Sequence, residues 1–164
     1  MFKHVKKNDS TIPKSGNGIF AKKDISKGTM VGKFSGKKVP ISNLSASDCL
    51  NSAILDDSTA ILGSGLSSCI NDIINLRQLT PQETNDILYH NKSFPKREGF
   101  EYNAVLVSNK KDIFLKAIRD IRKGNEIFIP YGKRYWLYVF HNKGYLTIFK
   151  TDSHGDFTSN KVVE

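Results

Sequence analysis

One short stretch of sequence occurs twice, and this duplication constrains the fold more than any other feature of the chain. Residues 21–28 (AKKDISKG) return as residues 117–124 (AIRDIRKG), an offset of 96 positions. Two copies are too few for a solenoid. The pattern predicts one β-unit used twice: a strand, a turn at Asp-Ile-x-Lys-Gly, and a second strand. Gly28 and Gly124 supply the positive φ that such a turn often needs.

Strand signals dominate elsewhere. Asn103–Ser108 and Ile113–Ala117 flank the turn-forming residues 109–112 (NKKD), which predicts a hairpin. Glu126–Ile129 indicates a further short strand. Strands do not alternate with long helical segments, which argues against a Rossmann-type nucleotide-binding fold.

Two short helices are expected. The run Thr80-Pro81-Gln82-Glu83 has the form of a capping box with proline at the first helical position, and predicts a helix to about His90. A second short helix is expected over Lys133–His141. The interpretation is a β-rich protein with minor helices.

The composition bounds the class of protein. With 164 residues and 10% aromatic side chains, the chain has the size and content of one domain with a packed core. Its two cysteines, Cys49 and Cys69, form no CxxC pair, and the histidines lack ligand spacing. We therefore expect reduced thiols, no disulfide scaffold and no metal site.

The start of the chain does not have the pattern of a signal peptide. The first ten residues (MFKHVKKNDS) are charged and lack the apolar core of a signal peptide. No apolar run approaches the length of a membrane span. The expectation is an intracellular protein, nuclear or cytoplasmic, that is not secreted and contacts no membrane.

Charge is unevenly distributed. The formal net charge is +9, yet residues 40–76 contain no Lys or Arg, so their four aspartates give −4 and the remainder carries +13. The stretch is either a mobile serine-rich insert or an acidic surface for a basic peptide. The basic remainder suits a polyanion such as nucleic acid. The four aspartates are Asp48, Asp56, Asp57 and Asp72.

Three segments carry candidate chemistry, and each is weak alone. Two glycines one residue apart, Gly16 and Gly18, let a backbone approach a ligand closely. Asn71-Asp72 places polar side chains in an apolar neighbourhood. Tyr131, directly after the expected strand at 126–129, can aim its hydroxyl into a cavity.

Together and in this order the segments resemble the SET domain, the fold of protein-lysine methyltransferases. The resemblance covers about residues 13–39 and 69–136, and the stretch from Ala117 to Trp136 is its most specific part. The motifs are GNGIFA at 16–21, DISKG at 24–28, FSG at 34–36, IND at 70–72, NA at 103–104, AIRDIRKGNEI at 117–127 and YG at 131–132.

The resemblance implies a mainly β SET-domain (β-clip) fold, with several small sheets, short helices and a pseudoknot in which the Asn71 and Tyr131 segments cross. It implies a single domain over 1–164, with core motifs at 13–136, an insertion at about 77–100 and a C-terminal extension at 137–164.

The resemblance also implies S-adenosylmethionine as the methyl donor. The expected catalytic residue is Tyr131, which also lies at the cofactor. Apolar walls of the lysine channel are expected from Phe34, Phe128 and Ile129. The expected cofactor-binding residues are Gly16, Asn17, Gly18, Ile19, Asn71, Asp72, Tyr131 and Trp136.

The sequence departs from the family pattern at several positions. Asp72 stands where the family usually has His, Phe34 where many members have a second active-site Tyr, and Pro130 where Asp usually precedes the Tyr. About thirty residues separate Asn71 from Asn103, where the family has a short step.

Three functions remain open. An active protein-lysine methyltransferase for a basic protein such as a histone is favoured by Tyr131 and Asn71. A catalytically inactive SET-fold module that recruits chromatin or protein partners is favoured by Asp72 and Phe34. A nucleic-acid-binding domain of an unrelated β fold ranks last, because the chain lacks an aromatic and basic stacking motif.

Overall fold

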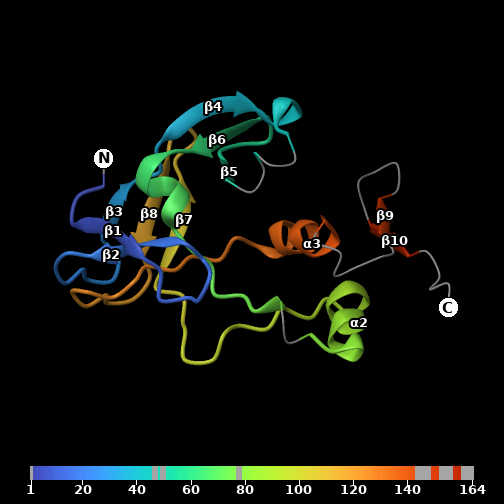
Figure 1. Ribbon diagram of the computed structural model, residues 1–164. Coiled ribbons are helices and arrows are strands. Elements are labelled where there is room, and N and C mark those ends of the chain that lie inside the picture. Colours follow the sequence, from blue (N-terminus) through green and yellow to red (C-terminus); the bar gives the residue numbers. More distant parts are fainter. Residues whose placement is uncertain are drawn as a thin grey trace. The chain divides into compact units, whose positions relative to one another are not determined.

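The computed structural model describes residues 2–45, 48, 51–76, 79–142, 149–151 and 157–159 (Figure 1). Cys49 and His154 lie outside the described residues, and so does much of the C-terminal extension expected at 137–164. The chain divides into two compact units, residues 1–74 with 96–130 and residues 75–95 with 131–164. Whether the chain acts as a single domain stays a prediction.

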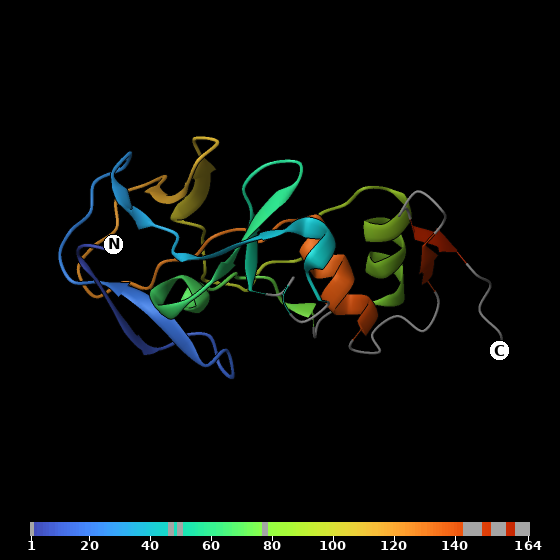
Figure 2. The same ribbon diagram turned by 90° about the horizontal axis from the view of Figure 1, so that it is seen from above.

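The first unit consists of three small antiparallel sheets (Figures 1 and 2). One pairs β1 (Val5–Asp9) with β2 (Asn17–Ala21). The second has the order β3 (Met30–Lys33), β8 (Ile113–Ala117), β7 (Ala104–Ser108). The third has the order β4 (Gly36–Pro40), β6 (Thr59–Gly63), β5 (Ser52–Ile54), with 3-10 helices η1 (Ile41–Asn43) and η2 (Gly65–Cys69) beside it in sequence. The mainly β architecture expected from the sequence is confirmed.

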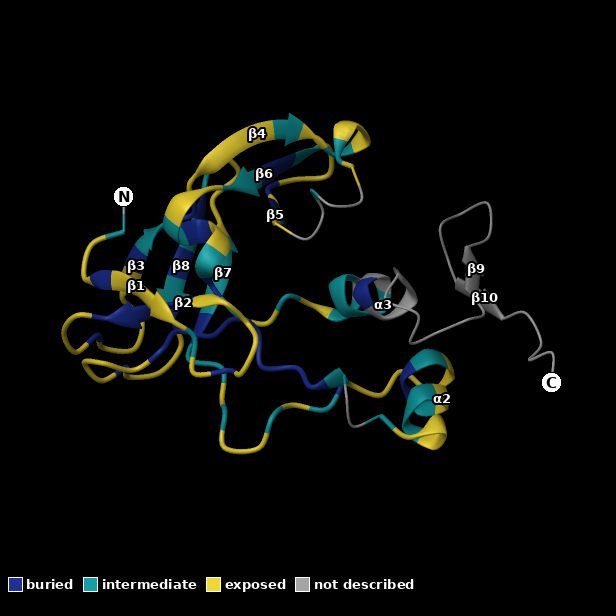
Figure 3. Cartoon of the chain, viewed as in Figure 1, coloured by how far each residue is buried: buried dark blue, intermediate teal, exposed yellow. Residues whose placement is uncertain are grey.

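The hairpin expected over residues 103–117 is confirmed as β7 and β8. Its register pairs Ala104 with Ala117 and Ser108 with Ile113. Burial alternates along β8, where Ile113, Leu115 and Ala117 are buried and the residues between them are half-buried (Figure 3). The period of two places one face of this strand in the core.

The two copies of the duplicated motif pair with each other. The turn glycines Gly28 and Gly124 both have φ of +87°. Ile25 and Ile121 exchange both backbone hydrogen bonds at 2.8 Å. Figure 1 shows the two loops side by side, the first in blue and the second in orange. The duplication therefore specifies one turn geometry that is used twice.

The flanking hydrogen bonds are reciprocal as well. The amide of Gly28 donates to the carbonyl of Ala117, and the amide of Gly124 donates to the carbonyl of Ala21, both at 2.8 Å. Each aspartate also caps the opposite loop, because Asp120 accepts from the amide of Lys27 and Asp24 from the amide of Lys123, both at 2.7 Å. Every one of these contacts maps onto its partner by the same offset of 96, so the two loops are related by an approximate two-fold axis.

Two expectations need correction. Residues 126–129 do not form a strand; they make isolated bridges, antiparallel from Glu126 to Phe20 and parallel from Phe128 to Asn71. Each bridge has a different partner, so no continuous ladder forms. The alternative of a mobile serine-rich insert at residues 40–76 also needs correction for its described part, because β5 and β6 build a sheet with β4.

The second unit contains the two expected helices. In α2 (Pro81–Tyr89), Thr80 and Glu83 form the complete capping box, each side chain accepting from the other residue's backbone amide. Helix α3 covers Lys133–Asn142. A two-stranded antiparallel sheet joins β9 (Phe149–Thr151) to β10 (Phe157–Ser159). No helix in the described part of the chain is long and apolar enough to cross a bilayer.

Candidate functional site

The GxG segment occupies the turn between β1 and β2 and the start of β2. Gly16 has φ of +69°, and its carbonyl accepts from the amide of Ser10 at 2.8 Å. Asn17 is exposed. A Cβ added to Gly18 would lie 2.0 Å from Oε1 of Glu126, so only glycine lets that carboxylate approach the strand. Ile19 is fully buried and its carbonyl accepts from the amide of Ile127 at 2.8 Å.

The carboxylate of Glu126 is the centre of this region. The residue is only 4% exposed. Its oxygens accept from the Ser10 hydroxyl at 2.8 Å, the Thr11 hydroxyl at 2.6 Å and the Thr11 amide at 2.7 Å. A buried carboxylate is costly unless donors replace its water. Hydrogen bonds supply that compensation here, since Glu126 forms no ion pair with any other described residue.

Asn71 joins the GxG segment to the same carboxylate. Its Nδ2 donates to the carbonyl of Asn17 at 2.9 Å and to Oε1 of Glu126 at 3.1 Å. Its own carbonyl accepts from the amide of Ile129 at 3.0 Å. The Asn71 segment therefore runs beside residues 126–129, which is the part of the expected crossing that lies within the first unit.

The side chain of Asn103 hydrogen-bonds to the backbone of residues 126–129 as a neighbouring strand would. Its Nδ2 donates to the carbonyl of Glu126 at 2.8 Å, and its Oδ1 accepts from the amide of Phe128 at 2.9 Å. One side-chain amide thus satisfies a donor and an acceptor of a segment that has no regular ladder. We name the group formed by Ser10, Thr11, Gly18, Asn71, Asn103 and Glu126 the Glu126 junction.

Asp72 is buried, and its carboxylate faces the interior. Oδ1 accepts from the hydroxyl of Tyr102 at 2.6 Å and from the amide of Ile74 at 3.2 Å. Burial, and then the hydrogen bond to Asp72, raises the pKa of Tyr102 well above its ordinary value. Tyr102 therefore remains a donor at physiological pH. Asp72 does not contribute to a surface charge, so only the other three aspartates can form the expected acidic surface.

Two of those aspartates stabilise their own turns. Ser45 donates to Asp48 from its hydroxyl at 2.6 Å, and this hydrogen bond lowers the pKa of Asp48. The amide of Ser58 donates to Asp56 at 2.9 Å and lowers the pKa of Asp56 in the same way. Both carboxylates stay charged near neutral pH, and both have a local structural role.

The three residues expected in the lysine channel are all buried, in different surroundings. Phe128 packs with Ile12 and Ile73 and meets the ring of Phe100 edge-on at 5.5 Å. Phe34 lies against Gly63, where an added Cβ would come within 2.8 Å of its ring. Ile129 is 3% exposed. An apolar environment surrounds each, and their joint role as channel walls stays a prediction.

Tyr131 and Trp136 lie in the second unit and contact each other. Their rings stack with an interplanar angle of 11° and centroids 6.0 Å apart. Tyr135 meets both rings edge-on, with centroids at 4.5 Å from Tyr131 and 5.1 Å from Trp136. Tyr131, the expected catalytic residue, and Trp136, an expected cofactor-binding residue, are thus brought into one aromatic group at the start of α3.

Two residues central to the site were not singled out from the sequence. Glu126 is an acidic residue at the head of an apolar run, and Tyr102 directly precedes Asn103. A lone acidic residue beside an apolar run is a usable signal of a buried carboxylate. Among the described residues no group of three or more His, Cys, Asp and Glu side chains is arranged to hold a metal ion.

Comparison with known proteins places these features in one family. The family model of the SET domain matches residues 16–132. No curated protein matches the sequence.

Solved structures resemble the chain at low identity. The methyltransferase domain of human PR domain-containing protein 2 is 18% identical, with a TM-score of 0.52 over 79% of this chain and 78% of that one. The ATXR5 SET domain in complex with histone H3 di-methylated on R26 is 21% identical, with a TM-score of 0.54 over 79% of this chain and 58% of that one. A chain of the Chaetomium thermophilum Polycomb repressive complex 2 is 19% identical, with a TM-score of 0.53; the match covers 80% of this chain but only 16% of that much longer one.

Proposed function

Because the chain belongs to the SET-domain family, we propose that it is an S-adenosylmethionine-dependent protein-lysine N-methyltransferase. The observation that carries the proposal is the Glu126 junction. One buried carboxylate and its hydrogen bonds hold together the GxG backbone, Asn71 and residues 126–129. The family resemblance assigns the cofactor to the GxG segment and Asn71, and walls of the lysine channel to Phe128 and Ile129. A buried polar network whose hydrogen bonds are satisfied makes the segments that it joins rigid.

The residues of the first unit suit the cofactor chemically. S-adenosylmethionine presents an adenine edge, a carboxylate and an ammonium group, which are matched by backbone amides, carbonyls and side-chain amides. At Gly16, which has a positive φ, no atom lies within 4 Å of the position that a side chain would take, and the exposed Asn17 follows it. Asn71 and Asp72 are assigned to the same site. We assign adenine stacking to Trp136, whose ring packs in the aromatic group of the second unit.

When bound, S-adenosylmethionine supplies an electrophilic methyl group on a sulfonium. The protein must then present a neutral amine in line with it. A free lysine has a pKa of about 10.4 and is therefore mostly charged at neutral pH. Desolvation and the nearby positive charge must lower this pKa so that the amine becomes neutral. Phe34, Phe128 and Ile129 are proposed to supply the apolar walls. Tyr131 is proposed to orient the amine through its hydroxyl.

The proposed substrate is a basic protein such as a histone, and we place the activity in the nucleus or cytoplasm. Support comes from the SET-domain neighbours, one of which is in complex with a histone H3 peptide. We also propose that the positively charged surface of the first unit contacts nucleic acid. The half-buried Asp48 and the exposed Asp56 and Asp57 remain the proposed acceptors of a basic peptide.

A second candidate function rests on Asp72. The family usually has His at this position, whereas here a carboxylate faces the interior and accepts from Tyr102. A cofactor site altered in this way suits a SET-fold module that recruits partners without catalysis. This alternative predicts a stable fold and partner binding without methyl transfer.

Incubation with labelled S-adenosylmethionine, core histones, nucleosomes and a cell lysate separates the two. Transfer of label to a protein band supports the enzyme, and the absence of both labelling and calorimetric cofactor binding supports the module. Tyr131→Phe should abolish turnover and leave the melting temperature nearly unchanged. Tyr135→Phe is the matched control, because it removes one hydroxyl from the same aromatic group and should retain activity. Full activity in the Tyr131 variant would remove that residue from the mechanism.

A further inference from the structure

The paired loops of the duplicated motif present an unusual charge arrangement. Both loops lie on the surface of the first unit, and their apolar centres, Ile25 and Ile121, are buried beneath them. The exposed positions carry cations in both copies. The first loop contributes Lys22, Lys23 and Lys27, and the second contributes Arg122 and Lys123.

These cations lack carboxylate partners. Within the described residues, none of the five forms an ion pair; Arg119, at the start of the second loop, is instead paired with Glu101. The only carboxylates on the loops are Asp24 and Asp120, and each is held by a backbone amide of the opposite loop. Five cations against two carboxylates leave a local charge of +3.

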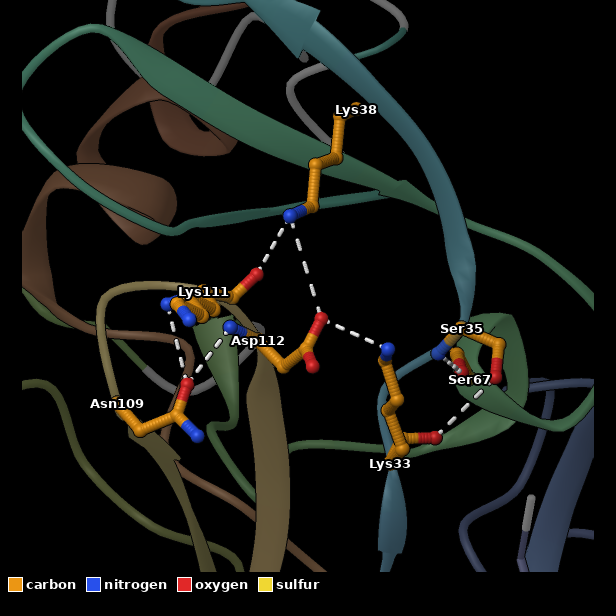
Figure 4. A network of polar contacts seen from close by, with 7 residues as sticks. All are labelled: Lys33, Ser35, Lys38, Ser67, Asn109, Lys111 and Asp112. Atoms are coloured by element: carbon orange, nitrogen blue, oxygen red, sulfur yellow. Dashed lines mark hydrogen bonds and ion pairs between the residues drawn. The ribbon is translucent and has the colours of Figure 1, made fainter.

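Another lysine cluster of the same unit is paired with a carboxylate. Figure 4 shows Lys33 and Lys38 converging on Asp112, with Nζ to Oδ1 distances of 2.7 and 4.0 Å. Lys38 also donates to the carbonyl of Lys111. The loop cations differ from this cluster, because the two aspartates on the loops are held by backbone amides.

We propose that the paired loops form a binding surface for duplex nucleic acid, contacting its phosphates. These loops would make the nucleic-acid contact proposed above, and this binding does not depend on methyl transfer. The approximate two-fold relation of the loops carries the argument. The two strands of a duplex are antiparallel and related by two-fold axes, so Lys27 and Lys123, which the offset of 96 relates to each other, can meet equivalent phosphates on both strands. The other three cations, Lys22, Lys23 and Arg122, add positive charge beside this pair.

The scarcity of apolar side chains on the loop surface favours nucleic acid over an acidic protein. Protein interfaces depend on a few buried aromatic or aliphatic anchors, whereas phosphate contacts need only cations and hydrogen-bond donors. In residues 22–28 and 118–124, all of which are described, Ile118 is the one exposed large apolar side chain, at 39% exposure. Neither loop contains an aromatic residue. Single strands are bound largely by aromatic stacking, so the loops suit a duplex better than a single strand.

The test is fluorescence anisotropy of the full chain, without methyl donor, on a labelled duplex of about 20 base pairs, which spans two helical turns. The variant Lys27→Gln, Arg122→Gln, Lys123→Gln removes three loop cations and leaves both aspartates and both glycines in place. The matched control, Lys37→Gln, Lys38→Gln, Lys111→Gln, removes the same charge from the exposed lysines of β4 and the β7–β8 turn. Circular dichroism and the melting temperature report whether each variant is folded. A second variant, Lys22→Gln with Lys23→Gln, changes one loop only.

We expect the triple loop variant to weaken duplex binding about tenfold or more at moderate salt. The slope of log K against log salt should fall by up to about 2.7, since each phosphate contact contributes about 0.9. The control should change affinity less than about twofold, and the double variant should lower the slope by up to about 1.8.

Three results would overturn the proposal. Equal losses in the loop variant and the control would mean that only net charge matters. Equal affinity for a single strand of the same length would remove the two-fold argument. Displacement of the duplex by polyglutamate at equal charge concentration would assign the loops to an acidic protein. None of these results bears on labelling by S-adenosylmethionine, so failure here leaves the proposed enzyme untouched.

Discussion

Met30 and Glu126 occupy equivalent positions after the two copies of the motif, yet their burial is inverted. Both follow a loop with the same glycine φ, and the next residues, Val31 and Ile127, are buried in both copies. Met30 is 55% exposed at the start of β3, whereas Glu126 is 4% exposed. The apolar side chain is outside and the charged one is inside.

The difference lies in what each copy pairs with. After the first loop, β3 pairs with β8 in a sheet, and this partner strand satisfies the backbone hydrogen-bonding groups of β3. After the second loop, residues 126–129 pair in turn with β2, Asn71 and Asn103, and the side-chain amides replace a ladder. The comparison teaches that one supersecondary unit can serve as sheet in one copy and as the scaffold of a site in the other.

The largest expected effect comes from removing the buried carboxylate. Glu126→Ala leaves donors of Ser10, Thr11 and Asn71 without their acceptor, and should lower the free energy of unfolding by about 3 kcal/mol or more. Met30→Ala, at the equivalent position, should cost about 0.5 kcal/mol or less. Urea denaturation of both variants measures the difference. Similar losses in the two would show that the inversion has no energetic meaning.

A smaller effect is expected at the glycines of the GxG segment. Gly18→Ala forces the Glu126 carboxylate to move, and should cost about 2 kcal/mol because the added methyl group overlaps it. Gly16→Ala meets no atom within 4 Å but has φ of +69°, so it should cost only about 1 kcal/mol of backbone strain. A Gly18 variant as stable as the Gly16 variant would mean that the carboxylate is free to shift.

The two copies should behave alike where their structures are alike. Asp24→Ala and Asp120→Ala each remove one 2.7 Å bond to a lysine amide of the other loop. Each should cost about 1 kcal/mol, equal within about 0.5 kcal/mol. Thermal denaturation of both variants provides the measurement. Unequal losses would indicate that the two-fold relation holds for the backbone of the loops but not for their aspartate side chains.

The smallest effect concerns the ion pair between Asp112 and Lys33. Lys33 is the residue of the first copy that corresponds to the buried Ile129 of the second. The hydrogen bond to Lys33 lowers the pKa of the carboxyl below its ordinary value. A lowered folded-state pKa stabilises the fold above the unfolded pKa of about 4, and the contribution is lost as pH falls through the folded value. Asp112→Asn should therefore lower the melting temperature slightly at pH 7, and by less at pH 3. A loss that grows on acidification would contradict this assignment.

Local features were predictable because neighbouring residues determine them. The capping box of α2, the β7–β8 hairpin and the paired glycine turns depend on side chains and dihedrals within a few positions of one another. The strand expected at 126–129 was wrong for the opposite reason. Its apolar run, Ile127 to Ile129, is buried as expected for a core segment, but the partners that decide its pairing come from three other segments.

The candidate site was predictable in part. The resemblance to the SET domain singled out the GxG segment, Asn71 and Tyr131, and the family is confirmed. It did not identify Glu126 or Tyr102 as members of the site. Their roles depend on hydrogen bonds to residues far away in the chain, which no local pattern records.

By itself the sequence determined that one turn would be used twice, since the repeated Asp-Ile-x-Lys-Gly carries its own conformational preferences. Only the tertiary structure decided that Glu126 would be buried and that Met30, its equivalent in the first copy, would be exposed. Hydrophobicity alone would bury Met30 and expose Glu126. The reverse holds because donors from Ser10, Thr11 and Asn71, at sequence separations of 116, 115 and 55 residues, converge on one carboxylate and replace the water it gives up.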